Sequence, residues 1–183
     1  TKKYNLYVLM YLNFDDENKI ISFFEDKFNI PTNNIVRGMH ITLYHSLIPI
    51  NLPSKDKNII SIDVDVEETR FMVMVPGGEN VKENILPSSK GIGIRLTKRN
   101  IAISKILEIR RNIYQNEPIL KTRKNTSDWK NAFGAKNFQP HMTLLKPGNN
   151  IPSDLTEVGN LFRKNFKQLN FKKLIIKKYL KNS

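Results

Sequence analysis

The strongest constraint on the fold is a tetrapeptide pattern that occurs twice, each time in a segment with the character of a β-strand. The first copy is residues 40–43 (HITL, within GMHITLYHS), and the second is residues 141–144 (HMTL, within QPHMTLLKP). In a strand, residues i and i+2 point to the same side. We therefore expect each histidine to share a face with its threonine, while the two apolar residues of each copy pack against helices.

Strand, helix and motif strand follow one another in both halves of the chain. Residues 4–12 are apolar and β-prone. Residues 13–30 place apolar side chains on one helical face behind Asn13 or Asp15 as a cap. In the second half, residues 91–98 predict a strand, and residues 100–116 predict a helix with Asn100 as its cap. Each such round includes one copy of the tetrapeptide.

The remaining segments complete the expected architecture. Two alternating segments, 58–66 and 69–76, predict a hairpin, a helix is expected from Ser153, and a strand is expected over 168–180. Residues 117–138 have no clean period and predict a long basic loop. We therefore predict the α+β class, with one domain over residues 1–183 built as two similar lobes, each an antiparallel sheet with helices on one face.

Charge and composition narrow the classes of partner. The chain has 30 Lys and Arg against 17 Asp and Glu, a net charge of +13, which favours RNA, nucleotides or phosphorylated ligands. A coding bias toward Lys, Asn and Ile explains the same charge without any such partner. Without cysteine the chain has neither a disulfide framework nor a thiolate metal site. With no segment typical of a signal peptide or a membrane helix, we expect a cytoplasmic monomer without membrane contact.

The repeated residue types point to acid–base chemistry at a phosphate. An imidazole titrates near neutrality, so one histidine can accept a proton while the other donates one. Threonine hydroxyls can hydrogen-bond the non-bridging oxygens of a phosphodiester as charge develops on them. No third histidine or carboxylate lies at metal-ligand spacing, so we expect no metal or cofactor. A single histidine on a strand is more often structural, and the repetition is what favours catalysis.

Paired His-x-Thr motifs with apolar neighbours resemble the signature of the two-histidine (2H) phosphoesterases. That superfamily includes 2′,5′ RNA ligase-like proteins, cyclic phosphodiesterases and viral enzymes that degrade nucleotide messengers. The resemblance covers most of the chain, because the strand–helix–motif order at the N-terminus also matches. It implies a bilobal, pseudo-symmetric fold with two antiparallel sheets lining a central cleft and helices outside. It also implies that His40 and His141 are the acid–base pair and that Thr42 and Thr143 bind phosphate.

Five further residues are candidates for substrate contact. Tyr44 lies two positions past the first threonine, so it is expected on the same face, where it can stack a base or only fill the groove. Arg95 and Lys146 can each meet phosphate or remain solvated surface charges. Trp129 and Phe133 belong to the basic loop and can cover a nucleobase or anchor the loop to the core. We interpret His45 as structural, since its odd spacing from His40 predicts the opposite face.

The expected function is a metal-independent phosphodiesterase that cleaves 2′-linked or cyclic phosphodiester bonds in nucleotides or short RNA. For a viral chain, the superfamily implies host 2′,5′-oligoadenylate or cyclic dinucleotide messengers as substrates, in the host cytoplasm. One alternative is a 2′,3′-cyclic phosphodiesterase that processes RNA ends. The others are a metal-dependent nuclease and a non-catalytic module that binds RNA or nucleotides. Which histidine acts as the base is left open by the motif.

Overall fold

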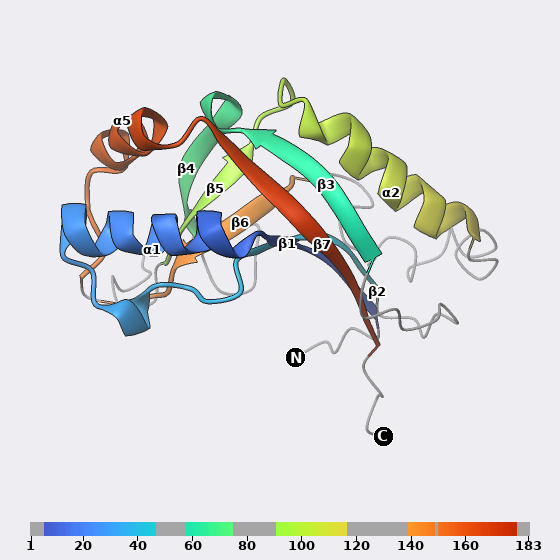
Figure 1. Ribbon diagram of the computed structural model, residues 1–183, viewed down its shortest axis with the longest axis horizontal. Coiled ribbons are helices and arrows are strands. Elements are labelled where there is room, and N and C mark those ends of the chain that lie inside the picture. The colour runs from blue at the N-terminus through green and yellow to red at the C-terminus, as the bar shows by residue number, and fades with distance from the viewer. Residues whose placement is uncertain (1–5, 47–57, 75–90, 117–138, 149, 179–183) are drawn as a thin grey trace.

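The computed structural model describes residues 6–46, 58–74, 91–116, 139–148 and 150–178. Within these ranges the chain forms two antiparallel sheets and three α-helices (Figure 1), so the α+β class is confirmed. The two ends of the described chain lie on the same side of the molecule in this view.

The larger sheet, called sheet A, has four strands in the order β2-β1-β7-β3. Its strands are β1 (Leu6–Leu12), β2 (His40–Ser46), β3 (Asn58–Asp65) and β7 (Gln168–Lys178). The smaller sheet, called sheet B, has the order β4-β5-β6. Its strands are β4 (Thr69–Met74), β5 (Gly91–Leu96) and β6 (His141–Leu145). The two motif strands, β2 and β6, each lie at one end of the strand order of their sheet.

The helices begin where their capping residues stand. Helix α1 (Phe14–Phe28) starts after Asn13, whose side chain accepts a hydrogen bond from the backbone N–H of Asp16 at 2.9 Å. Helix α2 (Ala102–Asn116) follows Asn100. Helix α5 (Leu155–Asn165) starts two residues later than predicted, because Asp154 is its cap.

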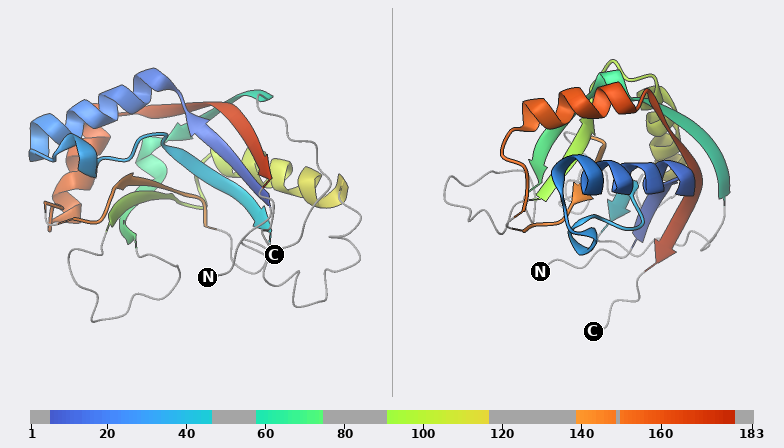
Figure 2. Two further views of the ribbon diagram at one scale, coloured as in Figure 1. Left: turned by 90° about the horizontal axis from the view of Figure 1, so that it is seen from below. Right: turned by 60° about the vertical axis from the view of Figure 1, so that its left-hand side comes forward.

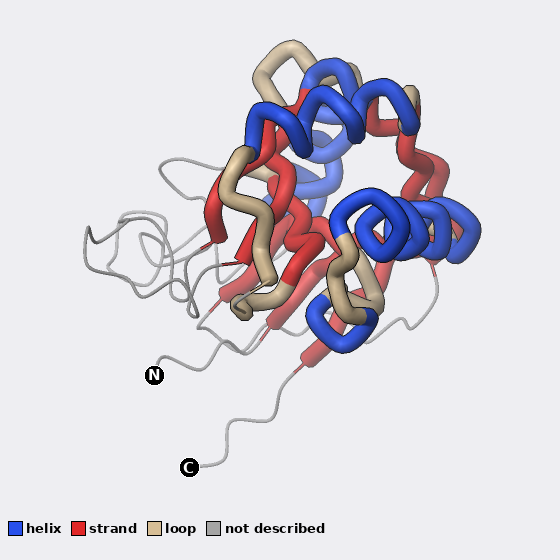
Figure 3. The backbone as a smooth tube through the Cα atoms, turned by 90° about the vertical axis from the view of Figure 1, so that its left-hand side faces the viewer, coloured by secondary structure: helices blue, strands red, loops and turns tan. Residues whose placement is uncertain are grey.

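The order of elements around each motif strand is the same. Among the described elements, β1, α1 and β2 come in this order in the first half, and β5, α2 and β6 come in this order in the second, with residues 117–138 between α2 and β6 outside the description. In both halves, the motif strand pairs antiparallel with the strand that precedes the helix. Figure 2 shows α2 on the opposite side of the molecule from α1 and α5, and Figure 3 looks directly at the side where α1 and α5 lie.

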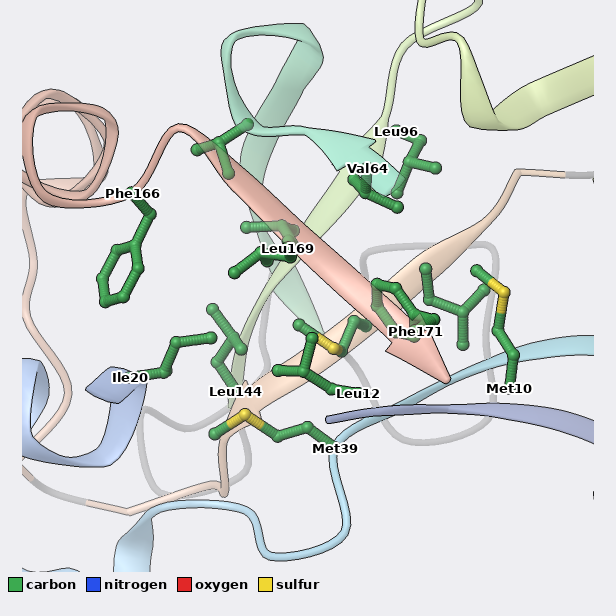
Figure 4. Close-up of a cluster of buried hydrophobic side chains, with 14 of the residues drawn as sticks. Met10, Leu12, Ile20, Met39, Val64, Leu96, Leu144, Phe166, Leu169 and Phe171 are labelled. Atoms are coloured by element: carbon green, nitrogen blue, oxygen red, sulfur yellow. The ribbon is translucent and has the colours of Figure 1, made fainter. Parts of the chain in front are cut away.

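The hydrophobic core is one cluster to which both sheets and all three helices contribute. Figure 4 shows side chains from α1, β1, β6 and β7 meeting there, among them Ile20, Leu12, Leu144 and Leu169. Aromatic rings join α1 and α5 to sheet B: Phe162 lies 5.6 Å from Phe23 and 5.2 Å from Phe71, between ring centroids. Helix α2 contacts β2 and β3 of sheet A. The helices thus pack against the sheets' apolar faces, as the alternation of the strands predicted.

The predicted hairpin over 58–66 and 69–76 is wrong. β3 pairs with β7 in sheet A, whereas β4 pairs with β5 in sheet B. The short 3-10 helix Val66–Glu68 separates them, and the buried side chain of Asn100 donates hydrogen bonds to the carbonyls of Asp65 (2.9 Å) and Glu68 (3.0 Å). These bonds hold a corner that directs the chain from one sheet into the other.

Among the helices of the described ranges, none combines the length and apolar character needed to cross a bilayer.

Candidate active site

The two tetrapeptides occupy the same place on their strands. His40 is the first residue of β2, and His141 is the first residue of β6. The apolar residues of both copies have no exposed surface: Ile41, Leu43, Met142 and Leu144. Both histidines and both threonines are partly exposed. The predicted alternation within each tetrapeptide is therefore confirmed.

Each histidine ring makes the same hydrogen bond to the backbone carbonyl two residues before it. Nδ1 of His40 lies 2.8 Å from the carbonyl oxygen of Gly38, and Nδ1 of His141 lies 3.0 Å from that of Gln139. A carbonyl oxygen can only accept, so Nδ1 carries the hydrogen in both rings. In the neutral form the lone pair is then on Nε2, which is the nitrogen that can take up a proton.

The residue before each histidine is held in the same way. The carbonyl of Met39 accepts from the N–H of Leu12, and that of Pro140 accepts from the N–H of Leu96, both at 2.9 Å. Leu12 and Leu96 are the last residues of β1 and β5, the strands that pair with the motif strands. Each motif is therefore docked onto its neighbouring strand by an equivalent bond.

In sheet A, β2 has one extra residue at the motif leucine. Leu9 of β1 pairs with Thr42. The next β1 residue, Val8, pairs with Tyr44, so Leu43 has no partner of its own in the register. This is the count of a β-bulge, in which two residues of one strand oppose one of the other.

Sheet B has a bulge at the equivalent residue. Gly93 of β5 pairs with Thr143, and Ile92 pairs with Leu145, so Leu144 is the extra residue of β6. The shared leucine of the two tetrapeptides therefore has a structural meaning. It is the bulged residue, and it packs into the core in both sheets.

The bulge overturns the expectation that Tyr44 shares the face of Thr42. Tyr44 is only 3% exposed and pairs with the fully buried Val8, so it lies on the core face of sheet A. There its ring lies 5.8 Å from the guanidinium carbon of Arg110 on α2. The i, i+2 rule fails here because Leu43 adds one residue between the two positions.

Arg110 supports the bulge from the helix side. Its Nη1 donates to the carbonyl of Leu43 at 2.5 Å. Burial lowers the pKa of Arg110 from its ordinary value to about 10, against an opposing effect of Tyr44. The guanidinium therefore remains charged at neutral pH and supplies a donor to the strand at the point where the regular ladder is interrupted.

The bulge also removes the basis for expecting His45 on the face opposite to His40. The spacing of five from His40 to His45 includes the bulged residue Leu43. In the backbone register, His40 pairs with Tyr11 and His45 pairs with Tyr7, and these two residues of β1 are four positions apart. The side chain of His45 lies outside the described part of the structure.

The residues beside the two histidines differ, and two of them, Tyr11 and Lys173, were not predicted from the sequence. Tyr11 pairs with His40, and their ring centroids lie 5.3 Å apart. Tyr11 in turn pairs with Lys173 of β7. On sheet B, Arg95 pairs with His141 and with Arg70 on its other side. Directly paired residues share a face. Lys173 therefore lies on the face of His40, two strands away, and Arg95 lies on the face of His141, on the adjacent strand.

The signal for Tyr11 and Lys173 is weak in the sequence. Alternation predicts the face of each within its own strand, but only the register between strands states which residue stands opposite which. Arg95 was predicted as a phosphate contact, and its position beside His141 is compatible with that role. Its Nη1 also lies 3.4 Å from the side-chain oxygen of Gln139.

A segment before β2 connects the two motif strands. Ile35 forms a bridge with Leu145, and the N–H of Val36 donates to the carbonyl of Leu144 at 2.9 Å. The chain then runs from this contact with β6 directly into β2 at His40. β2 and β6 also contact each other. The fold thus brings the two strands that carry the tetrapeptides side by side.

Of the other predicted contacts, one is described and two lie outside the described residues. Lys146 is exposed just after β6, where its backbone N–H donates to the carbonyl of Asn34 at 2.7 Å. Trp129 and Phe133 fall in residues 117–138, outside the described residues. A hollow of about 440 Å³ between α1 and α5 includes Lys19, Asp26 and other residues but neither tetrapeptide.

In the portion of the chain that the structure covers, no three His, Asp or Glu side chains are grouped closely enough to hold a metal ion. The candidate groups on the two motif strands and their neighbours are two imidazoles, two hydroxyls and the cations Arg95 and Lys173. No protein-family model matches the chain, and a search of curated proteins likewise finds no match.

Proposed function

We propose that the protein is a phosphodiesterase in which His40 and His141 act as a proton-transfer pair without a metal ion. The observation that carries the proposal is the structural equivalence of the two tetrapeptides. Each has Nδ1 bonded to the carbonyl two residues earlier and a bulge at the leucine that follows its threonine. Two ordinary strands that share letters by chance have no reason to share both features.

The chemistry uses the two Nε2 atoms in complementary states. One neutral imidazole removes the proton of the free ribose hydroxyl next to the phosphodiester, which is the 3′-hydroxyl in a 2′-linked substrate, and that oxygen attacks phosphorus. The bond from phosphorus to the leaving oxygen breaks, and the other, protonated imidazole gives its proton to that oxygen. A 2′-linked substrate suits this step, because the nucleophile is already attached beside the phosphate, whereas a 2′,3′-cyclic phosphate has no free neighbouring hydroxyl and is opened by water. Attack by water on a cyclic product runs the two proton transfers in reverse and restores both rings.

The threonines and cations complete the proposed site. The hydroxyls of Thr42 and Thr143 share the faces of their histidines and would donate to the non-bridging oxygens of the transition state. Arg95 beside His141 would hold the negative charge of the phosphate. This arrangement requires that the two motif faces border one cleft, as in the bilobal, pseudo-symmetric architecture of the 2H phosphoesterases. The contact between β2 and β6 and the repeated strand–helix–strand order support that architecture.

The substrate is a nucleotide or short RNA, which the net charge of +13 favours. By analogy with viral 2H enzymes, we include 2′,5′-oligoadenylate and cyclic dinucleotide messengers among its candidates. RNA ends that bear a 2′,3′-cyclic phosphate are the alternative within the same chemistry. These candidates differ in linkage, not in the catalytic groups they need.

The test is a substrate panel incubated in excess EDTA and read by chromatography. The panel contains 2′,5′- and 3′,5′-oligoadenylates, 2′,3′-cyclic nucleotides and cyclic dinucleotides. We expect turnover of at least one member, and a loss of about 100-fold or more in kcat for His40→Ala and for His141→Ala. Binding without any cleavage would support a non-catalytic module instead, and activity abolished by EDTA would support a metal-dependent nuclease.

The hydroxyls are tested with a matched change elsewhere. Thr42→Val and Thr143→Val remove a hydroxyl at nearly constant volume, and each should lower kcat about 100-fold if it serves the transition state. Thr156→Val makes the same change at an exposed position of α5 and should leave kcat unaltered. Equal effects at all three positions would argue against a phosphate-binding role.

A further inference from the structure

Glu17 is a buried carboxylate that the proposed chemistry does not use. It is 9% exposed, and among the described residues it is the only acidic or basic side chain that is buried. Its Oε1 accepts a hydrogen bond from the backbone N–H of Met39 at 2.5 Å. Burial of a charge is costly unless the charge is hydrogen-bonded, and a bond to a carboxylate is roughly twice as strong as a neutral one. The side chain therefore has a specific bond to maintain.

That bond lies directly beside the first histidine. Met39 precedes His40, and its carbonyl is already held by Leu12, so both backbone polar groups of Met39 are fixed. The residue before it, Gly38, has φ of +71°, a left-handed conformation that glycine adopts without strain. The carbonyl of this glycine is the acceptor for Nδ1 of His40. Any movement of Met39 therefore changes the group that orients the ring.

In the second motif, no N–H needs an acceptor at the position equivalent to Met39. Pro140 stands where Met39 stands in the first motif, and its carbonyl accepts from Leu96 in the equivalent way. Proline has no N–H to satisfy, and its ring fixes φ. In the first motif, Met39 has an N–H that requires an acceptor and follows a flexible glycine, and Glu17 supplies that acceptor.

We propose that Glu17 is the positioning residue of His40, a role that rests on the proposed function of the histidine pair. By holding the Met39 N–H, the carboxylate keeps the Gly38 carbonyl in place, so that His40 retains its hydrogen on Nδ1 and its lone pair on Nε2. A residue that only docks α1 onto the sheet would stabilise the fold without any particular effect on this ring. The two roles differ in what they do to His40 compared with His141.

The first experiment records the tautomers of the imidazole rings by nitrogen–proton correlation NMR on the full chain, above the pH at which the rings titrate. His40→Asn and His141→Asn spectra assign the signals. We expect the hydrogen on Nδ1 in both rings of the wild type, and a shift of His40 to a mixture of tautomers in Glu17→Ala with His141 unchanged. Equal changes in both rings, or no change in His40, would overturn the proposal. The readout needs no substrate, so it decides the role of Glu17 even if no phosphodiester is cleaved.

The second experiment measures kcat and KM with a substrate found in the panel. Glu17→Ala should lower kcat about tenfold with KM changed less than about twofold, because the base or acid is misplaced while the binding groups remain. Glu17→Gln keeps an acceptor oxygen but loses the charge, so its kcat should fall only about two- to threefold. If Glu17→Ala does not fold, Glu17→Gln decides the question by a partial tautomer change confined to His40.

The control is a variant that loses a different hydrogen-bonding carboxylate. Asp154→Ala removes the cap of α5, which accepts from the N–H groups of Thr156 (3.0 Å) and Glu157 (3.1 Å) and makes no bond to either tetrapeptide in these contacts. It should lower the thermal midpoint as Glu17→Ala does, while kcat and both tautomers stay as in the wild type. A loss of kcat in Asp154→Ala equal to that in Glu17→Ala would reduce the effect of Glu17 to stability and refute a positioning role.

Discussion

At the scale of single residues, the two tetrapeptides are equivalent in structure but not in surroundings. The same ring nitrogen bonds the same backbone position in both. The residue opposite the ring, however, is Tyr11 for His40 and Arg95 for His141. A proton-transfer pair needs its members in opposite protonation states, and unequal neighbours are one way to give two identical rings different tasks.

The role of Arg95 can be tested by a change of charge. Arg95→Gln should raise KM about tenfold and affect kcat less, because a cation beside His141 binds the phosphate in both the ground state and the transition state. The measurement is steady-state kinetics on a panel substrate. Arg99→Gln, an exposed residue in the turn after β5, is the matched control. Equal KM values for the two variants would leave Arg95 as an ordinary surface charge.

At the scale of elements, two bulges and one corner determine which faces meet the site. The bulges at Leu43 and Leu144 follow the motif threonines and send consecutive residues into the core. The corner at Val66–Glu68 separates β3 from β4 and so allows the chain to build two sheets instead of one long hairpin. Each of these features is an interruption of regular structure. Side chains support two of them, Arg110 of α2 at Leu43 and Asn100 just before α2 at the corner, whereas the carbonyl of Leu144 accepts from the backbone N–H of Val36.

The corner provides a stability prediction at this scale. Asn100→Ala removes donors to the carbonyls of Asp65 and Glu68 and the acceptor for the N–H of Ala102, so the free energy of unfolding should fall by about 2–4 kcal/mol. Urea denaturation measures it. Asn112→Ala, at an exposed position of α2, should change it by less than about 0.5 kcal/mol. A similar small loss for both variants would show that the corner does not depend on Asn100.

At the scale of the whole molecule, the net charge of +13 should govern how the protein meets a polyanion. We expect the affinity for a short single-stranded oligonucleotide to fall about 20- to 100-fold between about 50 and 200 mM salt, as for about three to five phosphate contacts. Fluorescence anisotropy measures this, with the thermal midpoint recorded at each salt concentration to verify that the protein stays folded. Affinity independent of salt would indicate that the charge reflects composition and not ligand binding.

The sequence allowed the local features to be predicted well. The strands and helices in the described ranges were expected near their observed positions, and Asn13, the observed cap of α1, was one of the two candidate caps. Alternation also predicted the buried and exposed residues inside each tetrapeptide, because the period of two holds over four residues of an extended chain. These are properties of neighbouring residues, which a linear pattern records.

The tertiary structure alone decided everything that depends on register and partners. A single extra residue in β2 moved Tyr44 to the core, which spacing along the chain could not reveal. The pairing of β3 with β7, the proximity of Tyr11 to His40 and the bond from Glu17 to Met39 join residues that are distant in sequence or on different elements. The sequence by itself determined which residues can do chemistry here, whereas the sheets decided which of them stand together, because hydrogen-bond register is set between strands and not within one.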